Sequence, residues 1–347
     1  MKLVKKRMIT ATILVCLLVP AIIVPELVTV FEFLLIFGAI MATLEMLNMY
    51  AAKGHVYSTK IKVMAVIFTI LLYFAIVNLS VEYFRFEEDE LKEISTNLEH
   101  SLIRKLLEAI HLENFITPIT VLTAVFIILM AVMTFSKELE VSDVGRILTA
   151  VVYVGVCTGS LTMLRHLGVR FVIFLLGITS FTDTFALVFG MAFGKHKMAP
   201  TISPKKTWEG AIGGTAVATV LGFLIIFLYP HFSSFFHNGR TIEFFDGVFG
   251  YAKFSTVGKV IFALVLSASI SICSQIGDLV ASKFKRNYGI KDYSQIFPGH
   301  GGVLDRFDSA FFASSIFIIF IICETKLYAP IIPNFNLNNL VTFIKGI

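Results

Sequence analysis

Charged residues are scarce in this chain, and their scarcity excludes most classes of soluble protein. Only 15% of the 347 residues are Asp, Glu, Lys or Arg, whereas an average globular domain has about 25%. Hydrophobic residues make up 56% of the chain, and its mean hydropathy is +0.84. A disordered chain or a coiled coil would carry far more charge. The composition therefore indicates a protein whose helices lie in a membrane.

Cysteine is also sparse, and its placement excludes a disulfide scaffold or a zinc site. The four cysteines all lie inside apolar stretches and lack the spacing of such sites. We interpret Cys16, Cys157, Cys273 and Cys323 as small apolar packing residues. The net charge of +5 favours anionic lipid and phosphate headgroups as partners. No basic groove with interleaved aromatic residues indicates nucleic acid.

Long apolar runs fill most of the remaining sequence. A transmembrane helix needs about 20 mostly apolar residues, and about nine stretches meet that requirement. They lie near 8–24, 27–49, 61–80, 116–135, 147–164, 169–193, 210–229, 258–282 and 308–323. The sequence therefore predicts an all-α polytopic membrane protein with about nine transmembrane helices.

Basic residues predict which loops face the cytoplasm. The cluster of Lys and Arg in residues 1–7 places the N-terminus there. Span parity then puts further loops on the same side, namely 50–60, 136–146, 194–209 and 283–307. The last two are the most basic of these loops. Arg165 and Arg170 lie in a short outside loop and are the one local objection to this topology.

We divide the chain along these spans. Helices 1–3 occupy 1–81, helices 4–5 occupy 116–168, helices 6–9 occupy 169–323, and a tail occupies 324–347. The connection 82–115 is expected outside the cytoplasm, and within it 88–111 has apolar residues at helical spacing. These are Leu91, Ile94, Leu98, Leu102, Leu106 and Ile110. We interpret the segment as an amphipathic helix on the outer membrane face or on its neighbours.

Polar residues interrupt the apolar pattern most clearly in 258–282. They form one helical stripe consisting of Ser267, Ser271, Ser274, Gln275, Asp278 and Ser282, and Lys285 continues it. Serines alone could be hydrogen-bonding contacts between helices. A carboxylate at membrane depth is costly and usually functional, so Asp278 is a candidate site residue.

A second polar stretch is Asp305-Arg306-Phe307-Asp308, which follows Pro298-Gly299-His300-Gly301-Gly302. Asp305 and Asp308 share one face if a helix begins here, and they repel unless a cation or proton joins them. Such ligands suit Mg²⁺ together with substrate phosphates, and the glycines let backbone amides approach an anion. Taken singly, the pair could be an acidic helix N-terminus favoured by the helix dipole.

Two weaker signals complete the set. The run from Ser203 to Gly210 contains Lys205 and Lys206, and alone it resembles an ordinary basic loop before a helix. Asp183 lies among threonines, where a buried, hydrogen-bonded carboxylate is the plainer interpretation. Together, these acidic and basic residues indicate a phosphorylated, metal-bound substrate handled at the cytoplasmic membrane face. The residues alone do not choose the reaction.

The polar residues from 282 to 308 also match a known pattern. The positions are Ser282-Lys283-Phe284-Lys285-Arg286, Lys291-Asp292, Ser294, Phe297-Pro298, His300-Gly301-Gly302-Val303 and Asp305-Arg306-Phe307-Asp308. This run resembles the signature of the phosphatidate cytidylyltransferases, or CDP-diacylglycerol synthases, at every specified position. The resemblance is strong over 169–323. It is weaker earlier, where Arg7 and Glu45 look family-like, and the 82–115 insert is atypical.

The resemblance implies a reaction and a set of site residues. CTP and phosphatidate would give CDP-diacylglycerol and pyrophosphate, the committed activation step of phospholipid synthesis. Mg²⁺, with a second cation also allowed, would be held by Asp278, Asp305 and Asp308. Lys285, Arg286 and Arg306 would join these aspartates in catalysis. Substrate binding would fall to Ser203, Lys205, Lys206, Ser282, Lys291, His300, Gly301, Gly302 and Asp183.

The resemblance further implies a homodimer, multi-pass in the cell membrane, with its active site facing the cytoplasm. CTP would arrive from the cytosol and the lipid from the inner leaflet. Two other classes stay open from the residues. A CTP-dependent lipid-alcohol kinase would transfer the γ-phosphoryl group instead. A transporter could line its path with polar stripes, although the paired, interrupted spans of many transporters are not apparent.

Overall fold

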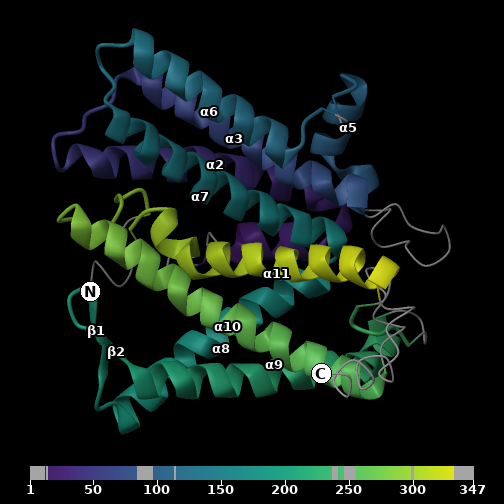
Figure 1. Ribbon diagram of the computed structural model, residues 1–347. Coiled ribbons are helices and arrows are strands. Elements are labelled where there is room, and N and C mark those ends of the chain that lie inside the picture. The colour runs from purple at the N-terminus through teal and green to yellow at the C-terminus, as the bar shows by residue number, and fades with distance from the viewer. Residues whose placement is uncertain are drawn as a thin grey trace, which may run out of the picture.

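The computed structural model describes residues 12, 15–83, 97–112, 115–236, 241–245, 255–297 and 301–331. Helices account for nearly all of its regular structure (Figure 1). They are the 3-10 helix η1 (Pro25–Leu27), then α2 (Val28–Ala51), α3 (Thr59–Tyr83), α5 (Leu102–Ala109), α6 (Pro118–Phe135), α7 (Val141–Leu167), α8 (Val169–Phe193), α9 (Trp208–Phe236), α10 (Thr256–Asn287) and α11 (Leu304–Ile331). Two short strands, β1 (Lys197–Ala199) and β2 (Ser203–Thr207), connect α8 to α9.

Eight helices in the described part of the chain are long and apolar enough to cross a membrane. Each predicted span from 27–49 onward corresponds to one of them, so the all-α polytopic class is confirmed. The predicted first span, 8–24, lies mostly outside the described residues. Several helices extend beyond the predicted spans, because polar residues in their terminal turns still form helical hydrogen bonds.

The helices form two groups that meet at α7. Helices α2, α3, α6 and α7 lie together, and α8 to α11 form the second group (Figure 1). Within the first group, α7 packs closely against α3 at a glycine. A Cβ atom at Gly159 of α7 would lie 2.7 Å from Cβ of Ile76, which is closer than such atoms approach. Small residues of this kind let membrane helices pack tightly without a hydrophobic driving force between them.

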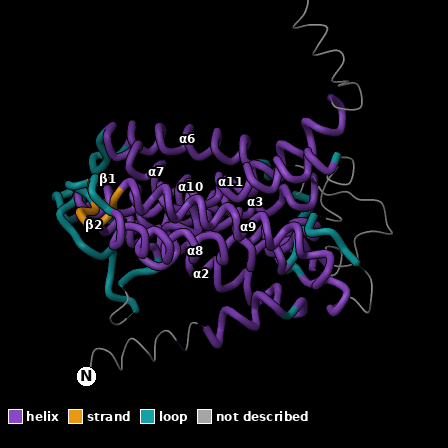
Figure 2. Tube along the Cα trace, turned by 90° about the horizontal axis from the view of Figure 1, so that it is seen from below, coloured by secondary structure: helices purple, strands orange, loops and turns teal. Residues whose placement is uncertain are grey.

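The basic segment between α8 and α9 forms an antiparallel β-hairpin, which the sequence analysis did not predict. Lys197 pairs with Thr207 and Ala199 with Ser203. The hairpin lies at one end of the helices (Figure 2). Its side chains therefore meet the terminal turns of the bundle instead of a helix face.

The four loops expected on one side of the membrane do lie at the same end of the molecule. The rings of Tyr50 and Tyr288 are 5.0 Å apart, and Arg146 Nη1 lies 3.2 Å from His55 Nδ1. Arg286 Nε donates to the carbonyl oxygen of Ile202 in the hairpin at 3.4 Å. These contacts agree with the span parity used in the prediction. The assignment of this end to the cytoplasm remains a prediction.

Arg165 lies toward the end of the molecule opposite these four loops, where the predicted topology does not favour a basic residue. The contacts of its side chain account for this charge. Its side chain is fully buried, and Nη1 donates to Asn97 Oδ1 at 3.1 Å. Nε and Nη2 donate to the carbonyl oxygens of Ala21 and Val24 at 3.3 and 2.9 Å. A charge held by protein acceptors has a structural role, so Arg165 does not weigh against the topology.

The structure describes residues 97–111 of the predicted amphipathic segment. Ser101 caps α5 by accepting from the backbone N–H of Arg104, so α5 begins at Leu102. Ile103 and Leu107 are buried against the protein, whereas Leu106 and Ile110 are 48% and 56% exposed. The predicted position on the outer membrane face stays a prediction. The predicted helix before residue 97 lies outside the described residues.

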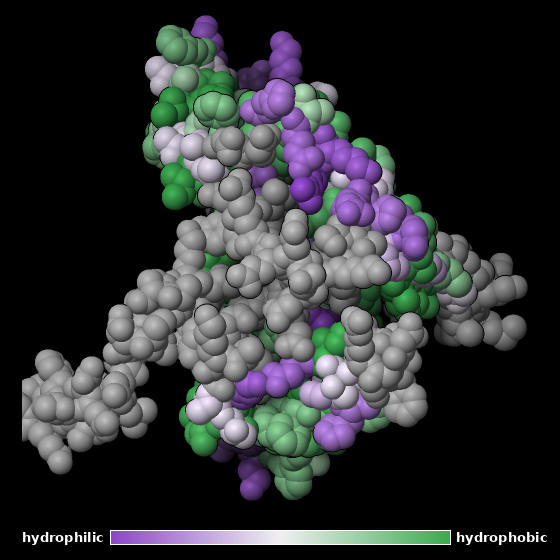
Figure 3. Space-filling view, turned by 90° about the vertical axis from the view of Figure 1, so that its right-hand side faces the viewer, coloured by the Kyte–Doolittle hydropathy of each residue, from purple (hydrophilic) through white to green (hydrophobic). Residues whose placement is uncertain are grey.

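Glu32 of α2 explains this orientation. Its carboxylate is buried and accepts from the Ser101 hydroxyl at 2.5 Å and from the backbone N–H groups of Leu102 and Ile103. His166 Nε2 lies 2.9 Å from the same carboxylate. An anion at a helix N-terminus satisfies amides that have no partner within the helix. Hydrophilic residues gather on the molecular face at this end (Figure 3).

Candidate active site

The charged residues predicted to act together meet where α10 crosses α11. A Cβ atom at Gly277 would lie 2.7 Å from the carbonyl oxygen of Asp308 and 2.6 Å from Cβ of Phe312. Only glycine allows this approach. It places Asp278, the next residue of α10, beside Asp308 of α11, and the two carboxylates interact electrostatically.

Asp278 is paired with the β-hairpin. Its Oδ2 atom lies 2.5 Å from Nζ of Lys206, and both side chains are only partly exposed. Ser282, one turn further along α10, lies 3.4 Å from Oδ1 of Asp278. Asp183 of α8 interacts electrostatically with both Lys206 and Asp278. The hairpin, α8 and α10 thus bring together four of the predicted site residues.

Strand geometry separates the two hairpin lysines. Successive side chains of a strand point to opposite faces, and Lys206 of β2 faces Asp278. Lys205 is therefore directed away from the aspartates and is exposed. Ser203 pairs with Ala199 inside the hairpin. Both lysines were predicted to bind substrate, but only Lys206 lies beside the carboxylates.

Asp305 is the most enclosed of the three aspartates. Its side chain is 3% exposed, and Oδ1 accepts from Lys285 Nζ at 2.7 Å. Oδ2 accepts from the backbone N–H groups of Tyr293 and Gly302 at 2.8 and 2.9 Å. Oδ2 thus holds the loop between α10 and α11, called the signature loop below, against the first turn of α11, and Oδ1 ties that turn to α10. Charge-assisted bonds of this kind are about twice as strong as neutral ones.

Tyr293 completes the surroundings of Lys285. The amine lies 5.3 Å from the centre of the Tyr293 ring, and the phenol donates to the carbonyl oxygen of Ala281 at 3.2 Å. Burial raises the pKa of the Tyr293 phenol above its ordinary value, and the negative charge of Asp305 adds to the shift. The phenol therefore stays protonated and acts as a donor.

Glu45 of α2 is a site-forming residue that the sequence analysis mentioned only as family-like. Its carboxylate is 3% exposed and accepts from the Ser294 hydroxyl at 2.6 Å. It also accepts from the backbone N–H groups of Val303 and Leu304 at 2.9 and 3.0 Å, so it caps α11. The signal was present, because a carboxylate inside an apolar span is costly wherever it occurs.

The two glycines of the signature loop make room for protein carboxylates. Gly301 has φ +84°, and a Cβ atom there would lie 2.8 Å from Oδ2 of Asp305. A Cβ atom at Gly302 would collide with the carboxylate of Glu45. The predicted close approach to an anion is therefore met by the protein's own carboxylates in this structure. Their contact with a substrate anion remains a prediction.

The remaining predicted residues lie around this centre. Arg286 donates to the carbonyl oxygens of Ile202 and Ile290, which ties the hairpin to the signature loop. Three basic side chains are exposed and form no hydrogen bond or ion pair with the aspartates in the described part of the chain, namely Lys205, Lys291 and Arg306. His300 lies outside the described residues.

The three aspartates predicted to hold a metal ion differ in their surroundings. Among the described residues, no group of three or more His, Cys, Asp or Glu side chains could hold a metal ion. The predicted set of three aspartates is thus not assembled as one cage. Asp278 and Asp308 remain adjacent, and the hydrogen bonds described for Asp308 come from its neighbour Ser309. Mg²⁺ commonly binds one or two carboxylates and completes its shell with water and substrate phosphates.

The bundle and this centre define a polytopic membrane protein with an ionic site at one membrane face. Residues 66–323 match the family described as "Cytidylyltransferase family". That range covers most of the chain and includes all of the described site except Glu45. The protein belongs to this family.

Three relatives have the same printed name, phosphatidate cytidylyltransferase. The protein from Staphylococcus haemolyticus is 32% identical over 197 residues, and the one from Staphylococcus epidermidis is 33% identical over 198 residues. The protein from Staphylococcus aureus (strain COL) is 32% identical over 197 residues. Each match covers 57% of this chain and 66% of the relative, which is just under two thirds of its length.

Proposed function

We propose that this protein is a phosphatidate cytidylyltransferase that converts CTP and phosphatidate into CDP-diacylglycerol and pyrophosphate. The observation that carries the proposal is the pair Asp278 and Asp308, flanked by the amines of Lys206 and Lys285 at one end of the bundle. Carboxylates can hold a cation while amines meet phosphate oxygens. The family and the names of the relatives support the same reaction.

In the proposed reaction, a phosphate oxygen of phosphatidate attacks the α-phosphorus of CTP. A new P–O bond forms, the bond from the α-phosphorus to the β-phosphate oxygen breaks, and pyrophosphate leaves with those electrons. The attacking phosphate is already ionised near neutral pH, so the site needs no strong general base. Its work is to position two anions and to neutralise their charge.

Asp278 and Asp308 would hold a divalent cation, most simply Mg²⁺, which would supply charge stabilisation to the triphosphate. Lys206 is poised for a second task, because its amine already lies beside Asp278. Any phosphate that shares a cation with Asp278 would come within reach of that amine. Asp305 keeps Lys285 and the signature loop in place, so it is a positioning residue in this proposal.

The test uses the purified full-length protein in lipid nanodiscs with phosphatidate and Mg²⁺. CTP labelled at the α-phosphate should transfer its label to lipid and release unlabelled pyrophosphate. Transfer of label from the γ-phosphate would instead indicate a CTP-dependent lipid kinase. Absence of transfer from either position by well-folded protein would refute the proposed reaction and leave a transporter as the better candidate.

We also propose that the site faces the cytoplasm and that the protein is a homodimer. The basic loops and their common end support the first statement. The second follows from the family resemblance. Light scattering of the detergent-solubilised protein tests the second, and a single chain mass at working concentrations would refute it.

A further inference from the structure

A groove of about 550 Å³ lies where α7 faces α11 and α10. Its lining is almost entirely apolar and includes Val152, Tyr153, Val156, Cys273, Phe312 and Ile316. The volume lies within the range of about 300–1,000 Å³ typical of sites for small molecules. The groove thus has the size and the surface of an apolar ligand site.

The lining of the groove comes within about one helical turn of the ionic site on α11. Phe312 and Ile316 follow Asp308 at intervals of one helical turn, and Ile319 lies about one turn further along the same face. From Phe312 to Ile319 the groove extends about 10 Å along α11. That length is about a third of a hydrocarbon core of roughly 30 Å.

Tyr153 lines the groove and has an unsatisfied hydroxyl. The hydroxyl oxygen is buried and has no hydrogen-bond partner among the described residues. Its ring lies 6.3 Å from that of Phe284 and 6.5 Å from that of Phe312. Buried hydroxyls are nearly always paired, so this one points to a polar ligand atom between the groove and the ionic site.

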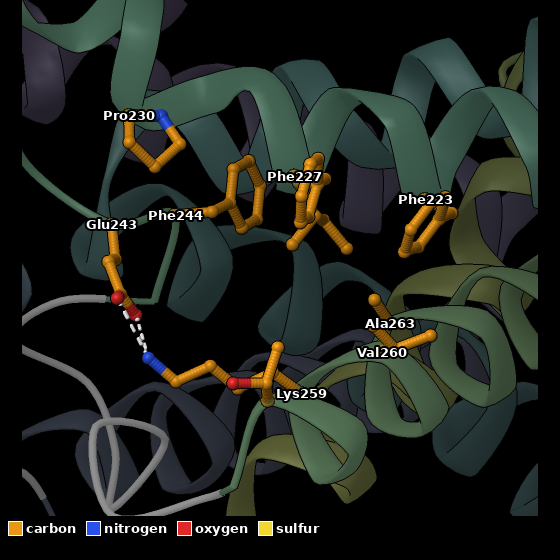
Figure 4. A pocket seen from close by; sticks show the side chains of 10 residues that line it. Phe223, Phe227, Pro230, Glu243, Phe244, Lys259, Val260 and Ala263 are labelled. Carbon is orange, nitrogen blue, oxygen red and sulfur yellow. Dashed lines mark hydrogen bonds and ion pairs between the residues drawn. The ribbon is translucent and has the colours of Figure 1, made fainter.

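Another cavity of the bundle lacks this continuity. Figure 4 shows a pocket of about 240 Å³ between α9 and α10, where Phe223, Phe227 and Phe244 lie beside an ion pair of Glu243 and Lys259. The amine and the carboxylate are 2.6 Å apart, so they satisfy each other. Lys259 precedes Asp278 on α10 by about 28 Å of helix. This pocket is separate from the proposed chemistry and provides a control.

We propose that the groove between α7 and α11 binds one acyl chain of phosphatidate, and that the Tyr153 hydroxyl donates to an oxygen of the same lipid's head or ester region. This inference rests on the proposed function, because it names where that reaction's lipid lies. An acyl chain is the occupant that fits an apolar groove whose lining begins about one helical turn from the proposed phosphate site. The polar end of that lipid would then lie beside Asp308 and Lys285.

The first test narrows the groove with Ile316→Trp. We expect the KM for a dioleoyl phosphatidate to rise about tenfold. A change of this size corresponds to roughly two methylene groups that are no longer buried in the groove. The KM for CTP and the turnover of a dihexanoyl phosphatidate should be unchanged. Val260→Trp adds the same side chain to the pocket of Figure 4 and should leave all three values at wild type.

The second test removes the hydroxyl with Tyr153→Phe. We expect the KM for both phosphatidates to rise about fivefold, the change expected for one lost hydrogen bond, while the KM for CTP stays constant. A purely structural hydroxyl would lower thermal stability and affect both substrates alike. Unchanged phosphatidate kinetics in this variant would remove Tyr153 from the proposal.

A direct measurement on the wild-type protein keeps the proposal testable if a variant misfolds. A phosphatidate with a photoreactive acyl chain should label peptides of α7 and α11, and excess dioleoyl phosphatidate should suppress that labelling. Labelling confined to other helices would overturn the proposal. So would an Ile316→Trp protein that becomes monomeric with normal lipid kinetics, because the groove would then be a contact between copies. If the wild-type protein transfers no cytidylyl group, the proposed function fails, yet the labelling still tests lipid binding.

Discussion

Replacing Asp308 by Asn separates a role in chemistry from a role in structure. Asp308 lies where α10 crosses α11, next to Gly277 and close enough to Asp278 for their charges to repel, and its described hydrogen bonds come from Ser309. Asn keeps an acceptor oxygen for Ser309 but loses the charge that attracts a cation. It also removes a repulsion between two neighbouring carboxylates. We therefore expect stability to stay level or rise while activity falls.

The size of the loss follows from the proposed cation. Removing a metal ion takes several kcal/mol of charge stabilisation from the transition state. A loss of about 2.7 kcal/mol already lowers the rate about a hundredfold. Turnover per folded protein should therefore fall about a hundredfold or more in Asp308→Asn, and the Mg²⁺ concentration for half-maximal activity should rise.

Asp305→Asn is the matched control, because it makes the same chemical change three residues away. Asp305 is paired with Lys285 and accepts two backbone N–H groups in a buried setting. Breaking a buried pair from one side costs about 3–5 kcal/mol, so this variant should also lose thermal stability. The assay is turnover across a Mg²⁺ titration, with a melting curve for each variant. Near-normal turnover by well-folded Asp308→Asn would refute the cation site.

Three further predictions test the scaffold and the topology. Glu45→Gln should lower the melting temperature and turnover together, because a charged cap of α11 is lost; an unchanged melting curve would refute the cap. Gly277→Ala should lower turnover about a hundredfold, as a misplacement of about 1 Å can, and wild-type turnover would show that the helix crossing tolerates a methyl group. Cysteines placed at Lys197 and Asn287 should react with impermeant reagents only from the cytoplasmic side. Labelling from outside intact cells would reverse the topology.

The sequence predicted the helices and the aspartates because both leave local signals. Apolar runs of about 20 residues indicate membrane helices, since a helix satisfies all backbone hydrogen bonds within one segment. Asp278 was found because a carboxylate in such a run is costly. Glu32 and Glu45 are also carboxylates in an apolar run, but they were not among the predicted site residues. The free-energy cost of burying a charge indicates that such a carboxylate has a partner. It does not indicate whether the partner is a substrate or the N-terminus of a helix.

Long-range pairing was beyond the sequence. Lys206 and Asp278 are joined only because the hairpin turns toward the end of α10, and nothing local distinguishes Lys206 from Lys205. The start of α5 depends on a distant residue in the same way. Glu32 of α2 accepts from the first amides of this helix. A period of apolar residues predicts a helix, but it does not reveal a partner of this kind.

The carboxylates around the signature loop differ in the groups that they bind, and this difference indicates different roles. Glu45 and Asp305 each accept two backbone N–H groups, and those bonds fix the loop and the first turn of α11. Asp278 is held by a flexible lysine, and Asp308 by its own neighbour. A carboxylate bonded to backbone amides can release them only by unfolding the turn, whereas Asp278 and Asp308 can exchange partners at little structural cost. Exchange of that kind is what a site needs if a cation and a phosphate are to enter and leave in every turnover.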